Sequence, residues 1–362
     1  MRLIDCDVHP LIPDAGDSLT PFLPEVWRRK LGNRELALAN PLPASRYSHP
    51  GGRVLRPDAQ PPGGGAPGSD AEFVRREVLD GQGAAAAILL PIQGAGVAAW
   101  TNAGEAAALA SAFNDYFIEH WLKLDERFRL AAVVAPQDPQ AAAAEVRRLA
   151  STPQLAAIWI PLLDILLGQE HYHPIYDAAA EAGLPIVVHP NGTEGIYQGC
   201  PSFACGMPRS YAERFVDLHQ LAQANLSSIV FEGVLDRWPS LRFAFTECGW
   251  TWLPAFLWRM DTTWKATRVE VPWVRERPSE LVRQRVRFTT QPVDEPDKQH
   301  RYIAQIAEMM MAKDVLMFSS DYPHWDSEDV TRVVRVMPEE LHDRVFFETA
   351  AETYGIDVLT HA

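Results

Sequence analysis

The fold class that this sequence of 362 residues predicts is α/β, a barrel of eight parallel strands alternating with helices. Three observations predict it. Short apolar runs recur along the chain, helical patterns lie between them, and the length suits one large barrel. The runs are apolar on both faces, as strands buried within a parallel sheet are.

The expected strands each span five to seven residues. In chain order they are Arg2–Val8, Ala84–Leu90, Leu130–Ala135, Ala156–Pro161, Pro185–His189, Arg242–Glu247, Val286–Thr290 and Val315–Ser320. The clearest helical patterns are Gly104–Lys123, Pro139–Leu149, His173–Ala182 and Tyr211–Leu226. Gly183 and Pro185 follow the third of these helices, a combination that is typical of a helix C-terminus.

One segment, residues 10–69, interrupts the alternation directly after the first strand. It contains no clear strand, and its stretch Pro61–Gly68 is incompatible with regular structure. Loops that follow barrel strands lie at the catalytic face, so we expect residues 1–362 to form one domain with this insertion over that face. For Pro61–Gly68 a pocket wall and a flexible surface excursion are equal alternatives, and for its flanks we favour the wall.

The charge balance is acidic, with 33 Lys and Arg against 47 Asp and Glu and a formal net charge of −14. This balance argues against nucleic-acid and anionic-membrane partners, since both need a basic face. No apolar run approaches the roughly 20 residues of a membrane span, and Asp5 interrupts the N-terminal apolar residues before a signal peptide can form. The four cysteines show no CxxC spacing. We expect a cytoplasmic protein with reduced thiols.

Polar side chains follow four of the expected strands where these strands end. Asp7 and His9 lie on one side of the first strand, His189 closes the fifth, Glu247 closes the sixth, and Asp321 follows the eighth. A lone residue of this kind is more often an ion-pair, cap or turn residue. A closed barrel, however, brings all four strand ends to one mouth. Imidazole and carboxylate without thiolate predict one catalytic divalent ion, Zn²⁺ before Mn²⁺.

Five segments of the chain form an ordered set. They are Ile4–His9, Gly183–Pro190, Gly233–Arg242, Trp252–Asp261 and Ser319–His324. Their order and spacing resemble the amidohydrolase superfamily, in the branch of aminocarboxymuconate semialdehyde decarboxylase (amidohydrolase family 2). The resemblance spans nearly the whole chain.

This resemblance implies a distorted TIM barrel that holds one catalytic divalent metal ion. Carried over position by position, the implied metal ligands are Asp7, His9, His189 and Asp321. Glu247 matches the acid/base group beside the metal, so the implied catalytic residues are Glu247, Asp321 and His189. Arg259 matches an arginine that in this branch enters the neighbouring subunit's site and binds substrate carboxylate, which implies a homodimer.

Two departures from the family pattern bear on the chemistry. The first strand has Asp7-x-His9 where the family usually has His-x-His, and the sixth has Glu247 where the decarboxylases usually have His. With Asp7, Glu247 and Asp321 ionised, three negative charges meet one divalent cation, and the local sum is −1. A carboxylate substrate then needs compensation by Arg259 or another cation. Otherwise Glu247 is protonated, with a raised pKa, or the substrate group at the metal is neutral.

Two reactions on a small-molecule substrate therefore stay open. The branch favours non-oxidative decarboxylation, a carbon–carbon lyase reaction, of a small aromatic or unsaturated carboxylic acid. Glu247 favours hydrolysis, in which Asp321 takes a proton from metal-bound water and Glu247 protonates the leaving group. A metal-free barrel that only binds a ligand is a minor alternative.

Five of the 11 tryptophans fall within residues 250–273, around Arg259. Large rigid aromatic side chains suit a dimer contact or the wall of a pocket for a flat substrate, although ordinary helix packing explains at least half of them. We expect Trp250 or Trp252 to line the site. His324 is expected to contact substrate or to support the ligands, not to bind the metal.

Overall fold

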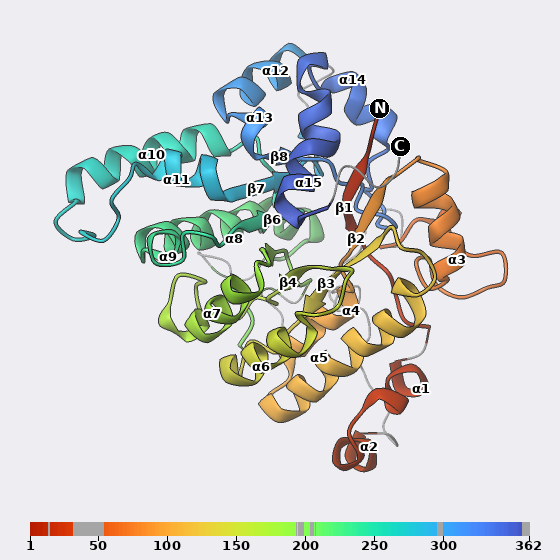
Figure 1. Cartoon of the computed structure of the whole chain (residues 1–362). Helices are drawn as coiled ribbons and strands as arrows, with labels where there is room; N and C mark the ends of the chain where they lie inside the picture. The colour runs from red at the N-terminus through yellow and green to blue at the C-terminus, as the bar shows by residue number, and fades with distance from the viewer. Residues whose placement is uncertain are drawn as a thin grey trace.

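The computed structural model describes residues 1–13, 15–31, 54–192, 194, 199–202, 206, 208–294 and 300–356. At its centre lies an eight-stranded parallel sheet in the order β1 to β8, so each strand pairs with the next one in sequence (Figure 1). The strands are β1 (Ile4–Val8), β2 (Ala86–Leu89), β3 (Phe128–Val133), β4 (Leu155–Trp159), β5 (Ile186–Val188), β6 (Phe243–Phe245), β7 (Val286–Thr289) and β8 (Leu316–Met317).

The sheet closes where β8 meets β1. The amide of Cys6 donates to the carbonyl of Phe318 at 3.1 Å, and the amide of Asp321 donates to the carbonyl of Asp7 at 3.0 Å. All eight strands overlap the ranges that the sequence predicts. The predicted α/β barrel is therefore confirmed.

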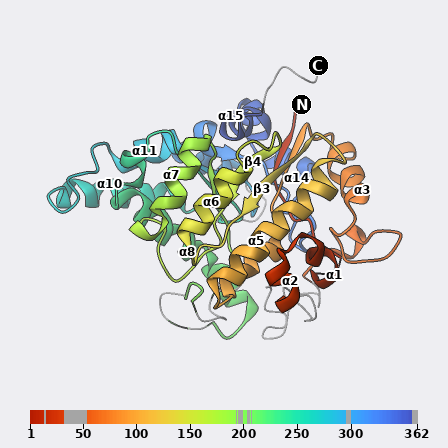
Figure 2. The ribbon, with the colours of Figure 1, turned by 60° about the horizontal axis from the view of Figure 1, so that its bottom comes forward.

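Helices separate consecutive strands and cover the outside of the barrel (Figures 1 and 2). They are α1 (Ala15–Leu19), α2 (Glu25–Leu31), α3 (Ala71–Val74), α4 (Ile92–Ala95), α5 (Ala103–Phe117), α6 (Pro139–Leu149), α7 (His173–Ala182), α8 (Tyr211–Phe231), α9 (Val234–Arg237), α10 (Leu253–Thr267), α11 (Pro278–Arg285), α12 (His300–Met309), α13 (Ala312–Val315), α14 (Val330–Val336) and α15 (Thr349–Tyr354). The bounds of α6 and α7 are the predicted ones. Of the helices that the structure describes, none is long and apolar enough to cross a membrane.

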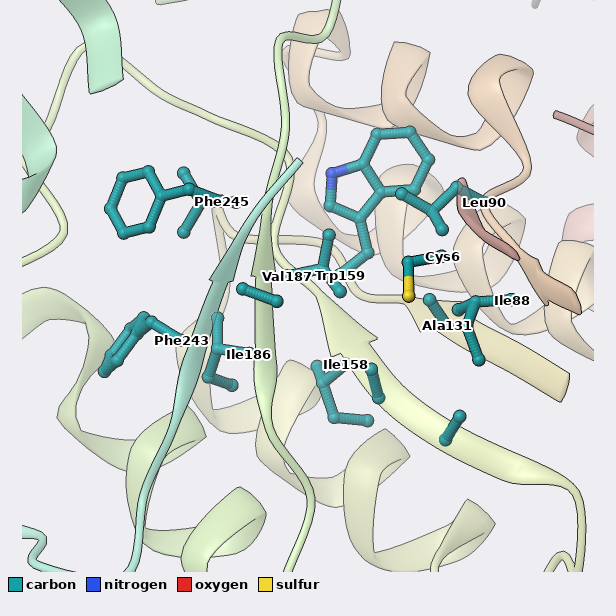
Figure 3. Close-up of a cluster of buried hydrophobic side chains, with 14 of the residues drawn as sticks. Cys6, Ile88, Leu90, Ala131, Ile158, Trp159, Ile186, Val187, Phe243 and Phe245 are labelled. Carbon is teal, nitrogen blue, oxygen red and sulfur yellow. The ribbon is translucent and has the colours of Figure 1, made fainter. Parts of the chain in front are cut away.

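The core is continuous from the inside of the barrel to the layer beneath the helices. Every residue of β2, β5 and β6 is buried. Figure 3 shows Ile158, Ile186 and Phe243 among side chains projecting from neighbouring strands of this cluster. Burial of one such side chain stabilises by roughly 1.5–3 kcal/mol, so the barrel is a firm frame for the groups at its strand ends.

The last strand is shorter than predicted because polar side chains replace backbone partners at the barrel mouth. β8 ends at Met317. The amide of Phe318 donates to the carbonyl of Val345 at 2.8 Å, and the two amides after it donate to side chains: that of Ser319 to Thr290 Oγ1 at 3.1 Å, and that of Ser320 to Asp5 Oδ1 at 2.9 Å. The ladder thus ends where the polar site begins.

The insertion at 10–69 is described except for residues 14 and 32–53, which lie outside the described residues. It contains two short helices that the sequence did not predict, and α1 lies beside α5 (Figure 2). Residues 54–69 lie against the strand ends: Leu55 forms an antiparallel bridge with His324, and the amide of Leu11 donates to the carbonyl of Gly68 at 2.9 Å. A Cβ at Gly68 would lie 2.8 Å from the carbonyl oxygen of His9, so glycine permits this approach.

Candidate metal centre and active-site cavity

The predicted metal ligands and Glu247 lie together at the carboxyl-terminal mouth of the barrel. Asp7 belongs to β1 and His9 follows it, while His189, Glu247 and Asp321 follow β5, β6 and β8. The side chains of Asp7, His9, His189 and Asp321 are fully buried, and that of Glu247 is 12% exposed. Two overlapping sets have their ligand atoms within 4.8 Å of one another: Asp7, His9, His189 and Glu247, and His9, Glu247, Asp321 and His324.

Short contacts arrange these groups around one centre. His9 Nε2 lies 3.1 Å from Asp7 Oδ1 and 2.9 Å from Asp321 Oδ1. His189 Nε2 lies 3.1 Å from Glu247 Oε2 and 3.6 Å from Asp7 Oδ2. Even so, both Asp7 oxygens and both imidazole Nε2 atoms lack an aligned hydrogen-bond partner among the described residues. Buried polar atoms rarely stay unpaired, and convergent imidazole and carboxylate atoms without mutual hydrogen bonds fit a single divalent cation.

Backbone carbonyls orient both imidazoles. Nδ1 of His9 lies 2.9 Å from the carbonyl oxygen of Leu90, and Nδ1 of His189 lies 2.6 Å from that of Pro190. In a neutral imidazole that donates through Nδ1, the lone pair is on Nε2. Both histidines therefore present Nε2 to the shared centre in the tautomer that a metal ion requires.

Two of the carboxylates stand on left-handed backbone. Glu247 has φ 53° and Asp321 has φ 60°, values that non-glycine residues adopt rarely. Such a conformation costs on the order of 1–3 kcal/mol and occurs often at functional sites. Each residue lies just beyond its strand, so this turn sets the direction in which the chain leaves the barrel mouth.

A second layer of polar groups supports the ligands, and the sequence analysis missed it. Asp5 Oδ1 accepts hydrogen bonds from the amides of Asp7 and Ser320. The Gln291 amide nitrogen donates to Asp321 Oδ2 and to Asp326 Oδ2, each at 3.1 Å. Gln291 follows the end of β7 by two residues, just as most of the predicted ligands follow the ends of their own strands. This position in the sequence could have identified Gln291 as a residue of the site.

The charges of the cluster differ with and without a cation. Before a cation binds, burial lowers the pKa of His189, but Asp7 and Glu247 outweigh burial and place this pKa well above its usual value, so that His189 is protonated. Burial raises the pKa of Glu247, but the 3.1 Å contact with protonated His189 brings it down to about 2. In that state the ionised form of Glu247 is favoured over the protonated form considered above. Burial also lowers the pKa of His324, yet Asp321 raises it to about 9.

A narrow cavity opens beside this cluster. Its lining contains Glu247, His324 and Asp326 from the polar cluster, Val54 from the insertion and Trp325 from the segment after β8. The rest of the lining is Ile92, Pro190, Gly192, Tyr211, Arg214, Phe215 and Leu218. Tyr211, Arg214, Phe215 and Trp325 were not among the predicted site residues. For the three residues of α8 the only signal was a helical spacing that ordinary packing also produces, and Trp325 lies in no helix.

Trp250 and Trp252, one of which is expected to line the site, are not among the described lining residues of this cavity. Trp250 is fully buried and its indole donates to the carbonyl of Thr290 at 3.1 Å. Trp252 donates to the carbonyl of Cys248 at 3.0 Å and packs edge-on against Phe288. Neither indole belongs to the described lining of the cavity, because both pack between α10 and the barrel. Trp325 supplies the indole of the cavity wall instead.

Comparison with protein families and curated proteins gives consistent results. The family model described as "Amidohydrolase" matches residues 4–356. Over 207 residues the chain is 26% identical to the gamma-resorcylate decarboxylase of Rhodococcus jostii (strain RHA1). That match covers 53% of this chain and 60% of the relative.

Solved structures share the fold over almost the whole chain. The 5-carboxyvanillate decarboxylase of Sphingomonas paucimobilis matches with a TM-score of 0.66 and 20% identity, over 98% of this chain and 99% of the other. An amidohydrolase of Mycobacterium avium subsp. paratuberculosis K-10 matches with a TM-score of 0.71 and 19% identity, over 99% of each chain. A dihydroxybenzoic acid decarboxylase of Polaromonas sp. JS666, with bound manganese and the inhibitor 2-nitroresorcinol, has a TM-score of 0.64 and 16% identity, over 98% and 97%.

Proposed function

The chain belongs to the amidohydrolase family, and from this premise we propose that it is a metal-dependent, non-oxidative decarboxylase of a small aromatic or unsaturated carboxylic acid. The observation that carries the proposal is the convergence of buried, unpartnered ligand atoms at the barrel mouth. An aromatic-walled cavity adjoins them. Similarity to proteins named as decarboxylases of aromatic acids supports carbon–carbon lyase chemistry.

The cation-binding residues in this proposal are Asp7, His9, His189 and Asp321, as the sequence predicts. When bound, the cation supplies Lewis acidity toward an oxygen of the substrate. Imidazole suits Zn²⁺ and carboxylate oxygens suit Mn²⁺. We keep both ions as candidates. The manganese in the Polaromonas structure makes Mn²⁺ a stronger candidate than the sequence alone did.

The chain's own residues have to supply one proton. When the bond between the carboxylate and its carbon breaks, carbon dioxide leaves and the electron pair stays on that carbon, which then takes a proton. The source we propose is the pair of Asp321 and His324, joined by a hydrogen bond of 2.6 Å, of which His324 lines the cavity. Water returns the proton after each turnover. Glu247, whose Oε2 lies 3.1 Å from His189 Nε2, serves as the second acid/base group.

A hydrolase is the second candidate, and Glu247 is the observation that favours it. An ionised carboxylate lines the cavity at this position, where it repels the carboxylate that a decarboxylase must bind. In hydrolysis Asp321 accepts a proton from the attacking water, and Glu247, once protonated, passes a proton to the leaving group. A neutral ester or amide substrate avoids the repulsion.

Product analysis separates the two reactions. Metal-loaded enzyme is incubated with monocyclic aromatic carboxylic acids and, separately, with their esters and amides, and carbon dioxide and products are quantified. We expect carbon dioxide from at least one acid. We also expect a loss of about 10²–10⁴-fold in Asp321→Asn, with Glu145→Gln on the outer helix α6 as a control that keeps activity. Hydrolysis without carbon dioxide release would favour the alternative, and full activity and metal content in Glu247→Gln would remove Glu247 from the mechanism.

We also propose that the enzyme is a cytoplasmic homodimer in which Arg259 serves the neighbouring subunit. Helix α10, which carries Arg259, extends away from the body of the barrel (Figures 1 and 2). Arg259 is exposed and lies outside the described lining of its own cavity, and the neighbouring Trp258 is 57% exposed. A dimer by light scattering, with activity restored on mixing Arg259→Ala and Asp321→Asn subunits, would support this arrangement. A monomer would contradict it.

A further inference from the structure

Helix α8 presents one face to the cavity. Tyr211, Arg214, Phe215 and Leu218 all line it, and their spacing of three and four residues places them on one side of the helix. Three of these side chains are aromatic or aliphatic. The fourth, Arg214, is the one Lys or Arg among the lining residues that the structure describes.

Arg214 is only 2% exposed, which is unusual for a guanidinium. Its Nη2 donates to Glu194 Oε2 at 2.8 Å, and Glu194 is itself fully buried. A guanidinium has five N–H donors, and its Nε is buried here without a partner in the described part of the chain. Because a buried cation is costly unless it is well paired, a guanidinium with spare donors at a cavity fits an anion that arrives with the ligand.

The wall next to Arg214 is aromatic. Tyr211 and Phe215 stack with their ring centres 5.6 Å apart and an angle of 19° between their planes. The ring centres of Phe215 and Trp325 lie 5.8 Å apart, with an angle of 53° between the ring planes. The Trp325 indole donates to the Tyr211 hydroxyl at 3.3 Å. Rings tied together in this way form a rigid surface that suits a planar ring in the cavity.

Acidic residues also line this cavity. Glu247 and Asp326 belong to its lining, and Asp7 and Asp321 lie in the adjoining polar cluster. A ligand with a single carboxylate at this centre would gain little from Arg214. A ligand with a second anionic group finds a separate cation for that group at the α8 face.

We propose that Arg214 binds a second carboxylate of the substrate, so that the preferred substrates are planar aromatic dicarboxylic acids. This inference rests on the proposed function for the carboxylate that leaves as carbon dioxide. The other carboxylate stays on the ring throughout the reaction. Arg214 holds it by charge-assisted hydrogen bonds, while the ring lies along the wall of Phe215 and Trp325. Glu194 fixes the guanidinium and offsets part of its charge.

The test measures ligand binding by calorimetry on the metal-loaded full-length protein. The probes are benzoate, benzene-1,3-dicarboxylate and benzene-1,4-dicarboxylate. We expect at least one dicarboxylate to bind about tenfold more tightly than benzoate. Arg214→Met should weaken dicarboxylate binding by about 10- to 100-fold and change benzoate binding by less than about twofold. Dicarboxylates that bind no better than benzoate, or an Arg214→Met variant with an unchanged preference, would overturn the proposal.

Glu194→Gln separates ligand binding from a purely structural ion pair. The glutamine keeps an oxygen that accepts from Arg214 but removes a negative charge, so dicarboxylate affinity should rise while benzoate affinity stays constant. If the ion pair only ties α8 to the segment after β5, Glu194→Gln should instead lower the melting temperature and weaken the binding of all ligands alike. This variant also tests the proposal if Arg214→Met does not fold.

The two proposals can fail separately. Arg214-dependent dicarboxylate binding without carbon dioxide release from any acid would refute the decarboxylase and leave the inference standing. Carbon dioxide release from aromatic dicarboxylic acids with equal efficiency in wild type and Arg214→Met would refute the inference and leave the decarboxylase standing.

Discussion

Removal of the divalent cation is expected to lower the thermal stability of this protein. Without a cation, both Asp7 carboxylate oxygens and Nε2 of His9 and His189 stay buried with no aligned hydrogen-bond partner among the described residues. Leaving one buried polar group unsatisfied costs about 1–3 kcal/mol, and more when it is charged. A cation that coordinates these atoms satisfies several of them together, so it binds the folded state in preference to the unfolded one.

The size of the effect follows from mass action. At a free cation concentration about 100 times Kd, binding to the folded state stabilises it by about 2.7 kcal/mol. Unfolding entropy is about 2.1 cal/mol/K per residue, which for a chain of 362 residues is about 0.8 kcal/mol/K. The melting temperature should therefore rise by about 3–4 °C on addition of the cation.

The assay is scanning calorimetry of chelator-treated protein to which Mn²⁺ or Zn²⁺ is added, with the bound metal counted by mass spectrometry. Asp7→Asn removes one ligand charge and should reduce the shift to below about 1 °C. Glu145→Gln removes another buried carboxylate, one that pairs with Arg148 on α6, and should keep the full shift. An unchanged melting temperature with every divalent cation, or a full shift in Asp7→Asn, would refute the reasoning.

Two further predictions concern the frame of the barrel. Asn114 holds β3 from α5, because its side chain donates to the carbonyl of Val133 and accepts from the amide of Val133, each at 2.9 Å. Asn114→Ala should cost about 2–4 kcal/mol in urea unfolding, and a loss below about 0.5 kcal/mol would contradict this. A Cβ at Gly168 would lie 2.2 Å from the Ser228 carbonyl oxygen, so Gly168→Ala should cost about 1–3 kcal/mol. A Cβ at Gly183 would have no atom within 4 Å and would suffer only from the unfavourable φ of +68°. Gly183→Ala should therefore cost about 1 kcal/mol. Equal losses in the two glycine variants would contradict the steric explanation.

The strands of the barrel were predictable because residues buried in a parallel sheet form short sequence runs that are apolar on both faces. Strands such as Ala86–Leu89 are apolar on both faces, and polar residues that close such runs, like His189, stand out against them. Strand ends were less predictable. β8 ends early because amides at the mouth bond to side chains of Asp5 and Thr290, which are distant in sequence.

The walls of the cavity were not predictable in the same way. Arg214 pairs with Glu194, 20 residues away, and Trp325 contacts Tyr211 of α8 across 114 positions of sequence. No periodic pattern distinguishes such residues from those of an ordinary helix face. Trp250 shows that closeness in sequence does not place a side chain in the cavity: it follows Glu247 by three residues, but its indole is buried and donates to the carbonyl of Thr290.

The join between β1 and β8 has a consequence for how the protein is made. Ser320 bonds to Asp5 across 315 positions of sequence, and Asp321 bonds to Asp7 at the same join. During synthesis the nascent chain holds β1 with an unpaired edge until β8 has left the ribosome, and such edges invite association with other chains. Cation binding by the proposed ligands is then expected among the last events of maturation, because Asp7 and Asp321 come from opposite ends of the chain.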